Sequence, residues 1–170
     1  DKDGVLMLTE LMYAQATQQT VTHFGGVGEY TEQDRKAHAG KSARTIIPEL
    51  QARYGLRGDM EPLMSYYRAA YMHMQDVNGI VVPDGVRELI SHLKKQGIKV
   101  GVGTGGNRLN AATSLRQTGL ADYFDVVVSA DDVEHGKPAP DTFLLAAQRL
   151  GIPPEKCVVI GDSHNDRRGA

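Results

Sequence analysis

The sequence predicts an α/β protein whose parallel sheet is covered by helices on both faces. From residue 84 onward, short apolar runs alternate with segments in which apolar residues recur at helical spacing. Glycines close these helical segments, and a new apolar run follows. Strands that alternate with helices are joined by right-handed crossovers, which makes the sheet parallel.

The second half of the chain can be divided into elements in order. Val86, Leu89, Ile90 and Leu93 recur at helical spacing, and Gly97 ends that segment. The expected helices are 86–97, 107–119 and 143–150, and the expected strands are 98–102, 126–128 and 158–160.

Residues 10–79 have a different pattern and predict a helical insertion. They are rich in Gln, Ala, Met and Tyr and have almost no β-branched runs. We expect helices at 10–24, 46–54 and 62–75. The chain opens at Asp1 without a preceding apolar strand and closes at Ala170 where a helix should begin, a pattern typical of a chain that continues at both ends in the natural protein.

Composition and charge exclude several classes of protein. The chain has 170 residues, 41% hydrophobic and 24% charged, which is typical of a soluble globular domain and excludes wholesale disorder. Nineteen basic residues against 21 acidic ones give a net charge of -2, so we expect no nucleic-acid partner. No apolar stretch approaches the roughly 20 residues of a membrane span. The single Cys157 favours a reducing compartment, and we expect a cytoplasmic protein.

Four acids flank the predicted sheet. Asp1 and Asp3 alternate, so an extended backbone would point both to one side, and Asp162 and Asp166 follow the last predicted strand. Because the carboxyl ends of parallel strands open at one edge, the two pairs can converge there. Converging carboxylates repel unless a cation neutralises them, and an all-oxygen ligand set suits Mg²⁺. The alternative is a solvated terminus and two helix N-caps.

A Thr and a Lys also follow predicted strands. The Thr104 hydroxyl, with the free amides of Gly105 and Gly106, predicts an anion site at a helix start. Two prolines fix the loop that carries Lys137, and so hold its ammonium in place. Taken alone, such a lysine would be a solvated loop residue.

In this order, these residues resemble the four motifs of the haloacid dehalogenase superfamily. The motifs read Asp1-Lys2-Asp3-Gly4-Val5-Leu6, then Thr104, then Lys137 in Gly-Lys-Pro-Ala-Pro, and then Gly161-Asp162-Ser163-His164-Asn165-Asp166. The resemblance implies a Rossmann-like core at 1–9 and 80–170 and a small helical cap at 10–79. Segments 136–143 and 161–166 are most similar to those of phosphoglycolate and sugar-phosphate phosphatases.

The resemblance also implies a reaction. A small phosphorylated metabolite would be hydrolysed in two steps, with Asp1 as nucleophile and Asp3 as acid and base. Thr104, Gly105 and Lys137 would bind the phosphoryl oxygens.

A metal site is implied as well. Mg²⁺ would be held by Asp1, the Asp3 carbonyl and Asp162. Asp166 would not bind the ion directly but would support the residues that do. In the cap, Lys41 and Arg44 beside Gly40 would contact the substrate. The alternative is that this basic pair is the solvated start of a helix.

Two departures from the family pattern concern the substrate. Leu8 replaces an Asp often found after the first motif, and Thr104-Gly105-Gly106-Asn107 is richer in glycine than the usual Thr-Asn-Lys. β-Phosphoglucomutase shares this type of cap, but it uses a His near the position of Tyr13 and an acid where Gly161 stands. We therefore favour hydrolysis over a mutase reaction.

Two further alternatives stay open. Residues 101–106 satisfy Gly-x-Gly-x-x-Gly between a strand and a helix, and Asp131 and Asp132 lie near the place of a ribose-binding acid, so this pattern also fits a nicotinamide-nucleotide site. The other alternative is a non-catalytic interaction module on a core that has lost its activity.

Overall fold

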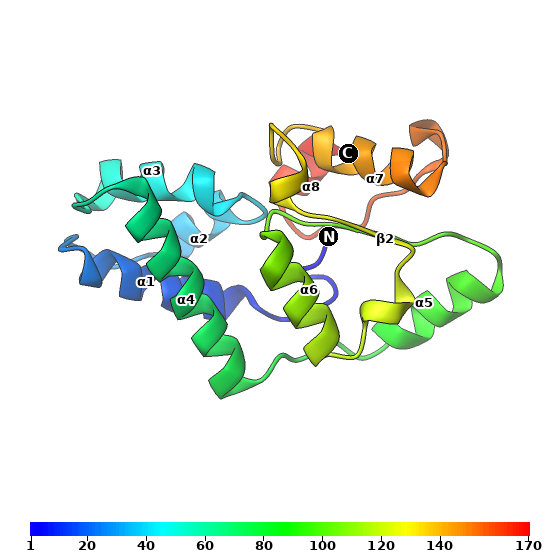
Figure 1. The fold of residues 1–170 in the computed structure, drawn as a ribbon, viewed down its shortest axis with the longest axis horizontal. Coiled ribbons are helices and arrows are strands. Elements are labelled where there is room, and N and C mark those ends of the chain that lie inside the picture. The colour runs from blue at the N-terminus through cyan, green and yellow to red at the C-terminus, as the bar shows by residue number, and fades with distance from the viewer.

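The computed structural model describes residues 1–170 and has a helical end and an α/β end (Figure 1). Four helices lie together at the helical end: α1 (Glu10–His23), α2 (Glu32–His38), α3 (Ala43–Tyr54) and α4 (Met60–Asn78). None of the helices has the length and apolar composition that a membrane span requires.

The α/β end is built on two parallel strands, β1 (Gly101–Gly103) and β2 (Val126–Val128), with Val102 opposite Val127. In Figure 1, α5 (Val86–Lys95) and α6 (Arg108–Gln117) lie on one side of β2, and α7 (Asp141–Leu150) and α8 (His164–Gly169) lie on the other. Helices therefore cover both faces, and the predicted α/β class is confirmed. Single helical turns occupy Ala121–Tyr123, Ala130–Asp132 and Pro154–Lys156.

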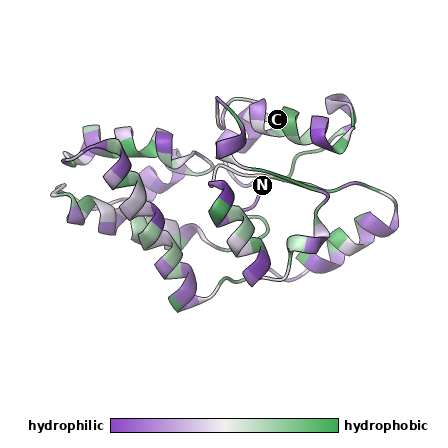
Figure 2. Ribbon diagram, viewed as in Figure 1, coloured by the Kyte–Doolittle hydropathy of each residue, from purple (hydrophilic) through white to green (hydrophobic).

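Each end has its own apolar core. The helical end buries residues from α1, α3 and α4, including Val21, Leu50 and Leu63. In the α/β end, Val102 of β1 packs with Leu115 of α6 and with Leu6 and Met7, which follow the first motif. Figure 2 shows β2 as an apolar segment, whereas the four cap helices mix apolar and polar residues. The exact boundaries at residues 9 and 80 stay a prediction.

Two predicted strands differ from the structure. The strand expected at 98–102 occupies Gly101–Gly103 only, and Ile98 is half exposed. The prediction of a strand at 158–160 is wrong, because these residues do not pair with any other strand. Val158 is 90% exposed, and the one backbone contact of this segment is the Asp1 amino group, which donates to the Ile160 carbonyl over 2.6 Å. An apolar run becomes a strand only when a neighbouring backbone pairs with it.

Helix α2 was not among the helices predicted from the sequence. It has seven residues and no apolar stripe, so hydrophobic periodicity could not reveal it. Its start is fixed by a capping box, in which Thr31 and Asp34 satisfy each other's backbone amides. Asp34 and His38 are its buried residues.

Candidate active site

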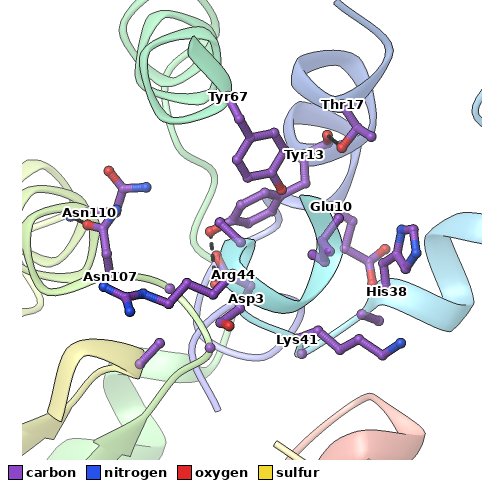
Figure 3. A pocket seen from close by; sticks show the side chains of 18 of the residues that line it. Asp3, Glu10, Tyr13, Thr17, His38, Lys41, Arg44, Tyr67, Asn107 and Asn110 are labelled. Atoms are coloured by element: carbon purple, nitrogen blue, oxygen red, sulfur yellow. Dashed lines mark hydrogen bonds between the residues drawn. The ribbon is translucent and has the colours of Figure 1, made fainter. Parts of the chain in front are cut away.

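A pocket lies where the helical end meets the loops at the carboxyl edge of the sheet (Figure 3). Both ends contribute to its lining, with Asp1, Asp3, Gly105, Gly106, Asn107 and Asp162 from the α/β end and Glu10, Tyr13, His38, Lys41, Arg44, Tyr67 and Arg68 from the helical end. The pocket is thus open to the predicted nucleophile and to the predicted cap residues.

Three of the four predicted acids form a cluster. Carboxylate oxygens of Asp1, Asp162 and Asp166 all lie within 4.8 Å of one another. Burial, followed by the neighbouring Glu10 carboxyl, raises the pKa of Asp162 to about 6. Carboxylates this close to one another repel, which is the condition in which they recruit a hard cation.

Gly4 makes room for this cluster. Its φ of +78° is a conformation that favours glycine, and a Cβ there would overlap the Asp162 carboxylate. Both the backbone conformation and the packing against Asp162 therefore require glycine at this position of the first motif.

Lys137 lies between two of the acids. Its Nζ is 2.7 Å from Asp1 Oδ1 and 2.6 Å from Asp166 Oδ1, and the side chain is fully buried. Burial lowers the pKa of the Lys137 ammonium below its usual range, while the adjacent Asp166 carboxylate opposes that shift. The solvated-loop interpretation of Lys137 does not fit this environment.

Asp166 also takes part in the capping box at the start of α8. The N-cap is Ser163, and the Asp166 carboxylate accepts from the Ser163 backbone amide and hydroxyl, so the N-cap alternative for Asp166 is wrong. Burial would raise the pKa of Asp166, but Lys137 and the Ser163 donors outweigh burial and hold it below its usual value. The same carboxylate thus anchors the helix and pairs with Lys137.

Asp3 is held by donors from several elements. The Thr9 hydroxyl donates to Asp3 Oδ1 over 2.6 Å, and the Lys2 ammonium lies 3.0 Å from the same oxygen. Thr9 is the N-cap of α1, yet its side chain caps no amide of that helix and binds Asp3 instead. Sequence analysis assigned no role to Thr9 or Lys2, although Lys2 stands between the two motif acids.

Two stacked tyrosines also reach Asp3. The rings of Tyr13 and Tyr71 lie 3.8 Å apart, and each hydroxyl is 3.5 Å from an Asp3 carboxylate oxygen (Figure 3 shows Tyr13). Burial, followed by the Asp3 charge, raises the pKa of both tyrosines, so both stay protonated donors. Tyr71 lies on α4, and a tyrosine in an apolar stripe carries no sequence signal of such a role.

The predicted anion loop is present with one difference. Thr104 is fully buried, and its hydroxyl lies 3.5 Å from Asp3 Oδ2. The Gly106 amide is not free as expected, because it donates to Thr104 Oγ1 over 3.1 Å. The Gly105 amide has no acceptor within the protein and stays available for a ligand.

The predicted cap residues lie in different surroundings. Lys41 Nζ is bound to Glu49 at 2.8 Å, and Figure 3 shows its side chain directed away from Asp3. Arg44 extends toward Asn107 at the start of α6 and forms no ion pair. Arg68, which sequence analysis did not select, also lines the pocket, and its Nε is buried without a partner.

The glycines of the nucleotide fingerprint have packing roles. A Cβ at Gly103 would lie 3.0 Å from the Phe143 ring, and one at Gly101 would lie 2.7 Å from Val126 Cγ2. The Asp131 carboxylate accepts from the Arg108 amide, and Asp132 pairs with Arg108 and Arg149. Asp132 is therefore neutralised by two arginines, whereas Asp131 is exposed and lines the pocket.

Comparison with known proteins identifies the family. The model of the haloacid dehalogenase-like hydrolases matches residues 1–170. The chain belongs to this family. The resemblance stated from the motifs is therefore confirmed, and so is the assignment as an enzyme, a phosphatase of this haloacid dehalogenase-like family.

Relatives support the same conclusion. The chain is 33% identical over 165 residues to the phosphorylated carbohydrates phosphatase of Thermotoga maritima, covering 96% of this chain and 74% of that protein. It is 32% identical over 166 residues to the pyrophosphatase PpaX of Bacillus cereus, covering 98% of this chain and 74% of that one. The crystal structure of CbbY from Rhodobacter sphaeroides in complex with phosphate has a TM-score of 0.83 and 25% identity, covering 98% of this chain and 77% of that chain.

Proposed function

We propose that the protein is a Mg²⁺-dependent phosphatase that hydrolyses a small phosphomonoester, such as phosphoglycolate or a sugar phosphate, through a phosphoaspartyl intermediate. The observation that carries the proposal is the buried Lys137 ammonium against Asp1, beside the acidic cluster and below the pocket. The names of the relatives, a phosphatase of phosphorylated carbohydrates and a pyrophosphatase, support phosphoryl chemistry on small molecules.

The donor set fits a magnesium ion. Its members are carboxylate oxygens of three acids that lie within 4.8 Å of one another, and Lys137 pairs with only two of these acids. Asp1, Asp162 and the Asp3 carbonyl would hold the ion, with Asp166 beside them. When bound, the ion would offset the negative charge of the phosphoryl group and of the acids.

In the first step, the Asp1 carboxylate attacks phosphorus. The new bond joins an Asp1 oxygen to phosphorus, and the bond between phosphorus and the leaving oxygen breaks. Asp3 gives its proton to that leaving oxygen. Thr9, Tyr13 and Tyr71 hold the Asp3 carboxyl in place for this transfer.

In the second step, Asp3 takes a proton from water, and that water attacks phosphorus. The bond between phosphorus and Asp1 breaks, so the carboxylate is regenerated and inorganic phosphate leaves. Thr104, the Gly105 amide and Lys137 supply fixed donors for the phosphoryl oxygens, whose charge grows in both transition states.

The pocket favours a substrate with a second anionic end. Arg44 and Arg68 both line it, and neither is paired with a carboxylate. An unpaired buried guanidinium nitrogen is costly, and a ligand oxygen would relieve that cost. Lys41, which Glu49 already neutralises, stays a prediction.

The mutase alternative lacks its expected groups in this pocket. Tyr13 stands where a histidine is used, and its hydroxyl faces Asp3. A side chain at Gly161 would overlap Asp166. Water is therefore favoured as the second acceptor over a sugar hydroxyl.

A metal-dependence assay tests the proposal. The protein is given p-nitrophenyl phosphate, phosphoglycolate, a sugar phosphate and pyrophosphate, each with Mg²⁺ and with a chelator, and phosphate release is measured. We expect release from at least one phosphomonoester, its loss with chelator, and its return with excess Mg²⁺. Equal rates with and without chelator, or transfer to a second sugar in place of phosphate release, would refute the proposal.

A further inference from the structure

The loop between α2 and α3 rests directly on the two loops that form the phosphoryl site. Gly40 of this loop is in contact with Gly105 on one side and with Ser163 on the other. A segment of the cap therefore lies between the loop that carries Gly105 and the loop that carries Ser163.

Asn165 forms the one cap-to-core hydrogen bond of this loop. Its Nδ2 donates to the Ala39 carbonyl over 2.7 Å, across 126 residues of sequence. Asn165 is 8% exposed, although the sequence predicted no role for it. Its side chain contributes nothing to the acidic cluster, which leaves the cap contact as its role.

The facing glycines allow the loop to come this close. A Cβ at Gly105 would overlap the Gly40 carbonyl oxygen and lie 3.0 Å from the Lys41 carbonyl oxygen. Gly105 does not have a positive φ, so its own backbone does not require glycine. The approach of the cap is what excludes a side chain there, and this explains the glycine-rich anion loop noted in the sequence.

Gly40 is restricted in a complementary way. Its φ of +76° favours glycine, and a Cβ there would lie 2.8 Å from Ser163 Oγ. On the cap side, the loop is tied to α3 through Glu49, which binds Lys41 at 2.8 Å and His38 Nε2 at 3.1 Å. The loop is thus held by α3 as much as by the core.

We propose that Asn165, Gly40 and Gly105 form a docking seam that positions the cap over the phosphoryl site. Asn165 is a positioning residue that acts through the Ala39 carbonyl, and the two glycines set how closely cap and core approach. The seam lies over the loops that would hold the phosphoryl group, and it would exclude bulk water from the aspartyl phosphate. This consequence rests on the proposed function.

Hydrogen exchange tests the seam without any substrate. Exchange of the amides of residues 39–42 is followed by mass spectrometry in the wild type and in Asn165→Ala and Gly105→Ala. A neutral hydrogen bond shifts an equilibrium by roughly 2- to 12-fold, so Asn165→Ala should speed exchange in this segment by that factor. Gly105→Ala should speed it further, because its methyl group blocks the closed position.

Two matched variants serve as controls. His164→Ala changes an exposed neighbour of Asn165, and Gly106→Ala adds the same methyl group where the nearest atom is 3.4 Å away. Both should leave exchange at 39–42 at the wild-type rate, and amides of β1 should be unchanged in all variants. Wild-type exchange in Asn165→Ala and Gly105→Ala overturns the seam. Equal acceleration at β1 also overturns it, because the residues would then stabilise the whole fold. Since no turnover is measured, failure of the seam is distinct from failure of the phosphatase proposal.

Discussion

Lys137 is the residue on which the site geometry depends most. It is buried between Asp1 and Asp166, so its removal leaves two carboxylates without their cation. We expect Lys137→Ala to lower kcat/KM by roughly 10²- to 10³-fold, with loss in kcat as well as in KM, because charge grows on the phosphoryl group in the transition state. Steady-state kinetics on p-nitrophenyl phosphate measures this.

The matched control is Lys95→Ala on the exposed end of α5. It should retain wild-type kinetics. If the two alanine variants have the same kcat/KM, Lys137 has no role in phosphoryl transfer.

Thr9 tests the orientation of Asp3. Thr9→Val keeps the shape of the side chain and removes the 2.6 Å hydrogen bond to Asp3. A hydrogen bond to a charged group contributes about 1.5–3 kcal/mol, so kcat should fall roughly 10- to 150-fold while KM changes little. Thr22→Val on the exposed face of α1 is the control. A kcat equal to that of the control would show that Asp3 does not need this donor.

At the scale of elements, α2 depends on one buried carboxylate. Burial would raise the pKa of Asp34, but hydrogen bonds from Thr31 and Tyr54 outweigh burial and, with Arg53, hold the pKa below its usual value. The stability that Asp34 contributes is therefore present at neutral pH and is lost as the pH falls through the lowered folded-state pKa.

We expect Asp34→Asn to lower the free energy of unfolding by about 1.5–3 kcal/mol at pH 7. The difference from wild type should shrink as the pH falls below about 4, the usual pKa of an aspartate. Urea unfolding at pH 7 and pH 3 measures this. A difference that is the same at both pH values would contradict the assignment.

The start of α3 and helix α4 bring two arginines, Arg44 and Arg68, to the pocket. Arg44→Ala with Arg68→Ala should lower kcat/KM for a substrate with a second anionic end by roughly 10- to 150-fold per contact, and should change p-nitrophenyl phosphate turnover far less. Arg57→Ala, on an exposed loop, is the control. An equal loss for both substrates would place specificity elsewhere in residues 10–79.

At the scale of the whole molecule, the sequence allowed us to predict that Asp1, Lys137, Asp162 and Asp166 converge, although the strand expected before Asp162 does not form. Apart from the neighbours Asp162 and Asp166, these residues are distant in sequence. Carboxylate oxygens of Asp1, Asp162 and Asp166 nevertheless lie within 4.8 Å of one another, and Lys137 forms ion pairs with Asp1 and Asp166. Helices with apolar stripes could also be predicted, because the spacing of apolar residues is a local property of the sequence.

Contacts between the two ends of the molecule could not be predicted. Nothing local marks Tyr71 as a neighbour of Asp3, Arg68 as a pocket residue or Asn165 as a partner of Ala39, because each contact depends on how the cap packs. The strand predicted at 158–160 is wrong for a related reason, because an apolar pattern does not show whether a neighbouring backbone will pair with the segment.

Covalent trapping on Asp1 tests the central claim most directly. The protein is mixed with a phosphomonoester and Mg²⁺, quenched in acid within milliseconds, and examined by mass spectrometry for a phosphoryl group on Asp1. We expect the adduct in the wild type and its absence in Asp1→Asn. In Asp3→Asn, turnover should fall by roughly 10²- to 10⁴-fold because acid and base assistance is lost. A phosphoryl group that still forms in Asp1→Asn, or turnover with no adduct in the wild type, would contradict the account.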